Sequence, residues 1–262
     1  MVNNALLVSD IHFGSEFHKS GRIIFEKFFT NYVTTKPDRI DTLIILGDGL
    51  DIVREQIWHI MKEAHWFFVK ATCCFDKIIW CIGNHELKAM QYLPQTMFGF
   101  YGFYGDHELS YDELDGAQIT IYPTIGFTAM VGDRLTRFMH GDAFDNHWHD
   151  YKQVLAPFLR TENFFGKIVR KLKGNPEAIS ISAYTAHNSR IAEAYGEHLV
   201  EKMSSVLPGE DTIIMGHMHR QGRWQLGNKE VICIGDFYEH ATCAEIIDGE
   251  IKLINLDNLE AS

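Results

Sequence analysis

Short apolar runs recur along the chain, and each ends in glycine and polar residues. The runs are 5–10 (ALLVSD), 42–48 (TLIILGD), 77–84 (KIIWCIGN), 136–142 (TRFMHGD) and 212–217 (TIIMGH). Their nearly continuous Ile, Leu and Val indicates strands that are buried on both faces of a sheet. Segments of helical period separate the first three runs, one beginning at 23–28 and another covering 56–71. Strands alternating with helices predict an α/β fold.

The pattern changes after residue 103, where short strand-like pieces follow one another at 118–123 and 126–132. Three further strand-like segments fill the last thirty residues, at 229–236, 242–248 and 250–256. Glycine or Asp-Gly pairs separate them, including the pair at 248–249, and such pairs favour tight hairpin turns. We therefore predict that the chain ends in a meander of antiparallel strands.

Residues 144–208 form a separate segment with a helical pattern. Between 151 and 173 there are six Lys or Arg residues and a single acid, Glu162. Apolar side chains fall on one helical face, with basic residues beside it, at Phe165, Ile168, Val169 and Leu172. Two interpretations fit this pattern: a core helix with a solvated basic face, or a cap over an anionic, amphiphilic substrate.

Length and composition favour a single large domain, 1–262, with 144–208 as a helical insertion inside it. The net charge of −11 argues against a general affinity for nucleic acid or anionic membranes. The five cysteines form no CxxC pair, so we expect reduced and mostly buried thiols in a cytosolic protein. We expect neither a signal peptide nor a membrane-spanning helix, because the chain has no basic start and no apolar stretch of ~20 residues.

Polar clusters with metal-ligand chemistry follow the five apolar runs. The side chains that could bind metal in them are Asp10, His12, Asp48, Asn84, His140, His217 and His219. Loops beyond the carboxyl ends of strands in an open sheet converge on one crevice. Nitrogen and oxygen ligands without thiolate suit Mn²⁺ first, with Fe, Zn²⁺ or Co²⁺ as alternatives. Seven ligands are too many for one tetrahedral ion, so the sequence predicts two divalent ions bridged by Asp48.

His85 follows Asn84 directly and is expected at the edge of this site. There it would stabilise developing charge or protonate the leaving oxygen. Asp51 is placed to orient His85. Each cluster alone has a simpler explanation, since a strand-end Asp is usually a turn former. The occurrence of all five at strand ends favours a metal site over coincidence.

The order DIH, GDGLD, GNHE, HGD and GHMH resembles the calcineurin-like metallophosphoesterase superfamily over essentially the whole chain. This resemblance implies two mixed β-sheets packed face to face and flanked by helices. It implies one ion held by Asp10, His12, Asp48 and His219. It implies a second ion held by Asp48, Asn84, His140 and His217. His85 would be the catalytic histidine, and Asp51 its partner.

Finer motifs resemble one branch, the UDP-2,3-diacylglucosamine pyrophosphatases and their relatives. These motifs are HGDAFD at 140–145, the helical insertion, GHMHR at 216–220 and the tail IGDFYEHATCAEIIDGEI. Enzymes of that branch cleave the pyrophosphate of a lipidated sugar nucleotide and cover the acyl chains with their insertion. The well-known members carry Arg where this chain has His85. Ser/Thr protein phosphatases are disfavoured, because they carry Arg-Gly where this chain has Ile52 and Val53.

The resemblance predicts a small phosphate-ester substrate, with or without acyl chains, and peripheral membrane contact through the insertion. His147, Asn188 and Arg190 are candidate substrate contacts, although a polar helix start or a surface helix explains them equally well. A nuclease, a nucleotide phosphodiesterase or a phosphomonoesterase would use the same metal site. A metal-free scaffold is the remaining alternative, and the seven intact ligand positions count against it.

Overall fold

The computed structural model describes most of the chain outside the predicted insertion. The described residues are 1–15, 19–37, 39–86, 109–114, 117–122, 125–144, 161, 198, 201–203, 205–207 and 209–256. The predicted cap at 144–208 therefore lies largely outside the described residues.

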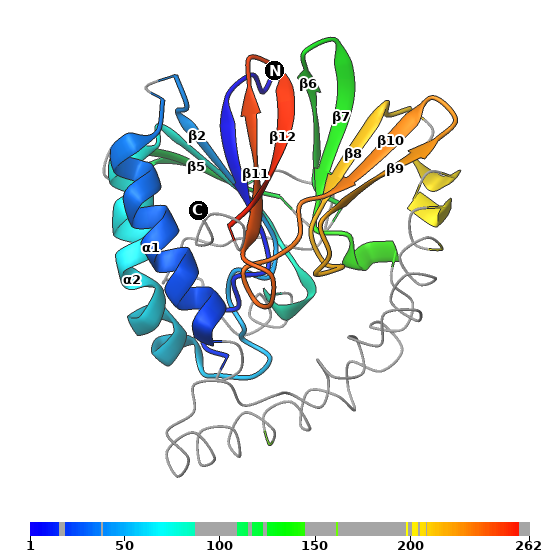
Figure 1. The fold of residues 1–262 in the computed structure, drawn as a ribbon. Coiled ribbons are helices and arrows are strands. Elements are labelled where there is room, and N and C mark those ends of the chain that lie inside the picture. Colours follow the sequence, from blue (N-terminus) through cyan, green and yellow to red (C-terminus); the bar gives the residue numbers. More distant parts are fainter. Residues whose placement is uncertain are drawn as a thin grey trace.

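The larger sheet has seven strands in the order β12-β11-β1-β2-β3-β5-β4. Their bounds are β1 Ala5–Val8, β2 Thr42–Leu46, β3 Lys77–Cys81, β4 Leu109–Leu114, β5 Ala117–Tyr122, β11 Thr242–Ile247 and β12 Glu250–Asn255. Strands β1, β2, β3 and β5 run parallel, and the strands outside them pair antiparallel. Helices α1 (Lys19–Thr35) and α2 (Ile57–Cys74) cover its outer face, as Figure 1 shows.

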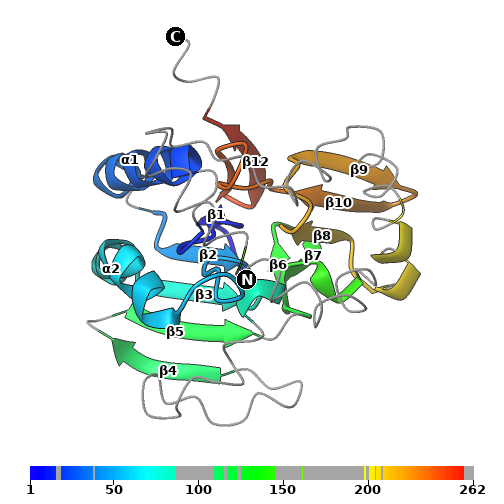
Figure 2. The same ribbon diagram turned by 90° about the horizontal axis from the view of Figure 1, so that it is seen from below.

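The smaller sheet has five strands in the order β6-β7-β8-β10-β9. Their bounds are β6 Phe127–Val131, β7 Arg134–Met139, β8 Thr212–Met215, β9 Gly222–Leu226 and β10 Lys229–Cys233. Strands β7, β8 and β10 are parallel, and β6 and β9 pair antiparallel at the two edges. A short 3-10 helix, η1 (Asp142–Phe144), follows β7. Figure 2 shows the two sheets from one end.

The three last strand-like segments do not form one meander, so that prediction is wrong. Strand β10 pairs in the smaller sheet, whereas β11 and β12 belong to the larger one. The chain crosses between the sheets at 234–241. The predicted Asp-Gly turn is confirmed, since Ile247 pairs with Glu250 and both Asp248 and Gly249 have positive φ.

Successive side chains on the central strands point to opposite faces of the sheet, and this alternation divides the core into layers. On β1, Leu6 and Val8 pack with helices α1 and α2, while Ala5 and Leu7 pack between the sheets. A third cluster covers the outer face of the smaller sheet and includes Met203. Because a two-sided strand needs apolar residues at every position, this layering explains the continuous apolar runs. The predicted fold of two mixed sheets with flanking helices is confirmed.

All five cysteines are free thiols, and Cys81, Cys233 and Cys243 are buried. Within the part of the chain that the structure describes, no helix is long and apolar enough to span a membrane.

Candidate metal centre

The predicted site residues meet at one end of both sheets. They come from the loops that follow β1, β2, β3, β7 and β8, which are the carboxyl ends of parallel strands (Figure 1). Backbone hydrogen bonds join these loops, with the N–H of His12 donating to the carbonyl of Asp48 at 2.9 Å. The N–H of Gly216 likewise donates to the carbonyl of His140 at 3.1 Å. The structure thus brings together all seven candidate ligands.

The backbone at this end is held in an uncommon conformation. Five of the seven candidate ligands have φ between 50° and 65°, namely Asp10, His12, Asp48, His217 and His219. Residues other than glycine rarely adopt this left-handed region, although Asp and His tolerate it better than most. Such outliers concentrate at functional sites, where the surrounding structure enforces them.

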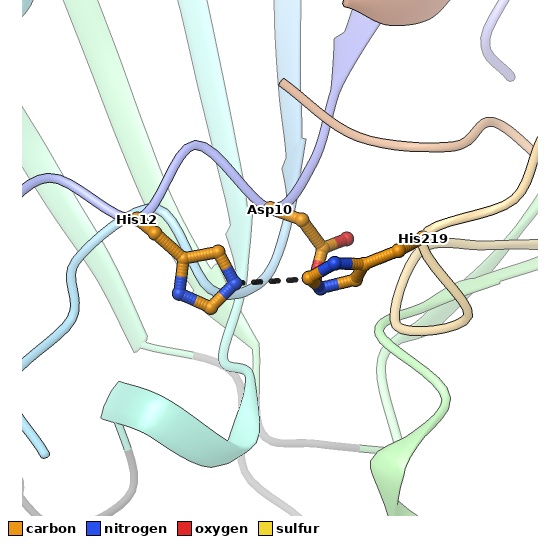
Figure 3. A group of neighbouring side chains, drawn as sticks. All are labelled: Asp10, His12 and His219. Atoms are coloured by element: carbon orange, nitrogen blue, oxygen red, sulfur yellow. Dashed lines mark ion pairs between the residues drawn. The ribbon is translucent and has the colours of Figure 1, made fainter. Parts of the chain in front are cut away.

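Asp10, His12 and His219 form the first group. The Asp10 Oδ1 lies 3.8 Å from the His12 Nε2 and 3.2 Å from the His219 Nε2. Figure 3 shows the two rings directed toward this carboxylate from separate loops. Burial alone would raise the pKa of Asp10, but His140 and His219 outweigh it and lower that pKa to about 2. Asp10 is therefore a buried carboxylate that stays ionised.

His140 is the centre of the second group. Its Nε2 lies 3.0 Å from the Asn84 Oδ1 and 3.3 Å from the His217 Nδ1. Its Nδ1 lies 2.7 Å from the carbonyl oxygen of Leu46 and donates to it. Because Nδ1 donates to that carbonyl, Nε2 is the ring nitrogen that faces the site, and loss of its proton would leave a lone pair there for a cation.

Asp48 lies between the two groups. Its Oδ2 is 3.3 Å from the His140 Nε2 and 3.9 Å from both the His12 Nε2 and the His85 Nε2. The side chain is buried, which opposes its charge, but His140 and the other histidines hold its pKa well below the ordinary value. A single oxygen that faces imidazoles of both groups has the placement of a bridging ligand.

His85 stands beside Asp48 and is held by Asp51. The His85 Nδ1 donates to the Asp51 Oδ1 at 2.7 Å, and the His85 backbone N–H donates to the Asp48 Oδ1 at 2.8 Å. Burial opposes a positive ring, yet the carboxylates of Asp48 and Asp51 outweigh it and raise the pKa of His85. The structure places Asp51, the predicted partner of His85, in contact with the His85 ring.

The donor set fits divalent cations. Buried polar atoms without a hydrogen bond include the Asp10 Oδ1 and both ring nitrogens of His12. Such atoms cost free energy unless an ion or water satisfies them. Two ligands at the usual ~2.1 Å from a metal lie about 3.0–3.4 Å apart, close to several separations seen here. A cation would thus satisfy atoms that the protein leaves unsatisfied.

The sequence analysis gives no individual role to four residues that support the site: Arg54, Glu86, Asp236 and Tyr238. The Arg54 Nε lies 3.4 Å from the Asp51 Oδ2, and the Arg54 Nη1 donates to the Tyr238 hydroxyl at 2.8 Å. The Tyr238 ring packs 4.7 Å from the His12 ring, measured between centroids. Asp236 contacts His219. These side chains surround the site rather than forming its centre.

Glu86 holds two of the site loops together. Its carboxylate accepts backbone hydrogen bonds from Asp48 at 3.0 Å, Leu50 at 3.0 Å and Gly83 at 2.7 Å. Burial, with the nearby Asp48 carboxylate, raises the pKa of Glu86 to about 7. The Glu of the GNHE motif therefore has a structural role.

We expect Glu86→Ala to lower the free energy of unfolding by about 3 kcal/mol, because it leaves three buried N–H groups unsatisfied at ~1 kcal/mol or more each. Urea unfolding measures the effect. Glu26→Ala, on the exposed side of α1, is the matched control and should stay within about 0.5 kcal/mol of the parent. Equal effects of the two variants would contradict this role.

Gly83 is required by the close approach of Asp48. A Cβ at position 83 would lie 2.2 Å from the Asp48 Oδ1. We expect Gly83→Ala to displace that carboxylate and to weaken metal binding at least tenfold, as measured by titration calorimetry. Gly209→Ala is the control, because a Cβ there would meet nothing within 4 Å. Unchanged metal affinity in Gly83→Ala would refute the proposed position of Asp48.

The three predicted substrate contacts, His147, Asn188 and Arg190, lie outside the described residues. They remain predictions.

A comparison with known families decides the class of this protein. The family described as calcineurin-like phosphoesterase matches residues 4–221, which is most of the chain. The chain belongs to the calcineurin-like phosphoesterase family. Members of this family use divalent metal ions, and the chain is accordingly a metal-dependent phosphohydrolase. A search of curated proteins found no match.

Comparison with solved structures gives distant matches. A dimetal phosphatase from Danio rerio is 11% identical, with 97% of this chain and 99% of that chain covered and a TM-score of 0.43. An archaeal phosphodiesterase is 13% identical, with coverage of 97% and 99% and a TM-score of 0.42. Vacuolar Protein Sorting 29 from Cryptosporidium parvum is 10% identical, with coverage of 96% and 95% and a TM-score of 0.41. Likeness at this level says nothing about substrate.

Proposed function

We propose that this phosphoesterase hydrolyses a pyrophosphate or phosphodiester bond with two divalent ions. Asp10, His12, Asp48 and His219 would hold one ion, and Asp48, Asn84, His140 and His217 the other. The observation that carries the proposal is the position of Asp48, whose Oδ2 faces His12 of one group and His140 of the other. A pair of ions at such a site clamps a phosphoryl group and activates water for in-line attack.

His85 would supply the proton in this reaction. Asp51 accepts from the Nδ1 of His85, so the opposite ring atom, Nε2, is the one that faces Asp48, at 3.9 Å from its Oδ2. The Asp48 and Asp51 carboxylates outweigh burial and raise the pKa of His85, which favours the protonated form of that nitrogen. The protonated Nε2 can stabilise charge on the phosphoryl oxygens or donate to the leaving oxygen.

For the substrate we propose a lipidated sugar nucleotide or a related pyrophosphate, with Mn²⁺ as the metal. The support is the resemblance of HGDAFD, GHMHR and the C-terminal tail to the UDP-2,3-diacylglucosamine pyrophosphatase branch. The basic, amphipathic pattern of 151–173 suits acyl chains beside phosphates and allows peripheral membrane contact. The five free thiols favour a reducing compartment, so we place the reaction in the cytosol.

A substrate panel with Mn²⁺ tests this function. It should contain an acylated UDP-sugar, its deacylated form, a phosphodiester, a phosphomonoester and a single-stranded oligonucleotide. We expect hydrolysis of the pyrophosphates, with the highest kcat/KM for the acylated form. Preference for the oligonucleotide would favour a nuclease, and preference for the monoester a phosphatase. If metal-loaded protein hydrolysed none of these compounds, the result would favour a scaffold protein without catalytic activity.

A further inference from the structure

Asp236 is a buried carboxylate that the chemistry above does not use. It follows β10, where the chain begins to cross from the smaller sheet to the larger one, and its side chain is fully buried. Its Oδ2 lies 3.2 Å from the Nδ1 of His219. The other ring nitrogen of His219, Nε2, lies 3.2 Å from the Asp10 Oδ1 in the first ligand group. The imidazole of His219 therefore joins Asp236 to the metal site.

The Asp236 carboxylate is held firmly on its other side. Its Oδ1 accepts backbone hydrogen bonds from Glu239 at 3.3 Å and His240 at 2.7 Å. Its own backbone N–H donates to the Thr242 Oγ1 at 2.8 Å, and its carbonyl accepts from the Thr242 N–H at 2.7 Å. Because these hydrogen bonds fix the carboxylate, the position of the Asp236 Oδ2 does not depend on its contact with His219.

Two roles are compatible with this neighbourhood. His219, Asp236 and Glu239 have ligand atoms within 4.8 Å of one another and would make a separate cation site. That site would need the Nδ1 lone pair of His219. If the Nε2 lone pair serves the first ion, however, the neutral ring carries its proton on Nδ1, and that proton needs an acceptor. Both roles cannot hold in one neutral ring.

We propose that Asp236 is a positioning residue that accepts the Nδ1 proton of His219 and so presents the His219 Nε2 to the first metal ion. This inference rests on the proposed function, because it takes His219 as a ligand of that ion. Acceptors of this kind fix the tautomer and orientation of metal-binding histidines, and their loss costs ~10–100-fold in metal affinity.

The variant Asp236→Asn tests the proposal with little change of shape. An amide has one acceptor oxygen and one donor group. It can accept from the backbone of Glu239 and His240 or from His219, but not from both sides. We expect the Asn variant to bind one of the two Mn²⁺ ions 10–100-fold more weakly in titration calorimetry. The melting temperature of the metal-free variant should stay close to that of the parent.

Glu239→Gln is the matched control, because it removes a neighbouring negative charge and leaves Asp236 in place. We expect it to bind two ions with the parent affinities. A parent that binds three ions, with the third lost in Glu239→Gln, would overturn the proposal in favour of a separate cation site. Parent-like affinity for both ions in Asp236→Asn would also overturn it. A parent that binds no metal would instead refute the proposed function.

A measurement on the unsubstituted protein decides the matter if Asp236→Asn does not fold. Nitrogen-15 NMR of histidine-labelled, Zn²⁺-loaded protein distinguishes a protonated ring nitrogen from a metal-bound one. The His219 signals are those absent from a His219→Gln variant. We expect a protonated Nδ1 and a metal-bound Nε2. The reverse assignment would overturn the role of Asp236.

Discussion

Asp48→Asn is expected to abolish phosphohydrolase activity and to reduce bound divalent metal from two ions per chain to one or none. The Asp48 Oδ2 faces imidazoles of both ligand groups, so its loss weakens both ion sites at once. An amide nitrogen in its place carries no negative charge and donates rather than accepts. We expect metal affinity to fall by more than the ~10–100-fold typical of a residue that only supports a ligand.

Metal content of the purified variant and turnover on the best substrate of the panel measure this effect. Asp41→Asn is the control, since Asp41 is exposed and lies just before the other end of the same strand, β2. It should retain two ions and parent-like turnover. If Asp48→Asn retained both ions with parent affinities, the bridging position of Asp48 would be wrong.

His85→Ala is expected to lower kcat by about 10²–10⁴ while both ions stay bound, because general acid catalysis contributes on that scale. The expectation that both ions stay bound is a strict test, because the geometry would also allow His85 to be a metal ligand. His85, His12 and Asp48 offer ligand atoms within 4.8 Å of one another, so His85 has the reach of a ligand. Turnover and metal content, measured on the same sample, separate proton donation from ligation.

If the His85→Ala variant bound one ion fewer than the parent, His85 would be a metal ligand and not the proton donor. Asp51→Asn should reproduce part of the turnover defect, because Asp51 holds the His85 ring at 2.7 Å. His59→Ala is the control: that ring is exposed on α2 and pairs with Glu55. It should change neither turnover nor metal content.

The meeting of the seven candidate ligands could be predicted because each stands where an apolar run ends. Parallel strands place their carboxyl ends at one edge, so polar residues at those ends must approach one another. The same rule could have found Asp236. The run that ends in Gly235-Asp236 has the same form as the one ending in Gly47-Asp48. The sequence analysis places this run in a C-terminal meander and in a family motif, and gives Asp236 no role of its own.

Other features could not be predicted from sequence. The pairing of β10 with β8 rather than β11 depends on which sheet the chain joins after residue 234, and local pattern does not encode that choice. Arg54 and Tyr238 come from segments far apart in sequence and meet only in the fold. Two of the three backbone hydrogen bonds that Glu86 accepts come from the loop that follows β2, and no periodicity describes the path of that loop.

The left-handed backbone of five candidate ligands has a consequence for thermal stability. Each such residue costs on the order of 1 kcal/mol, and a domain of ordinary stability has only about 5–15 kcal/mol in total. Divalent cations that bind only the folded protein would raise the free energy of unfolding and offset the cost of this backbone strain. Heat resistance of this enzyme should therefore follow the free metal concentration around it.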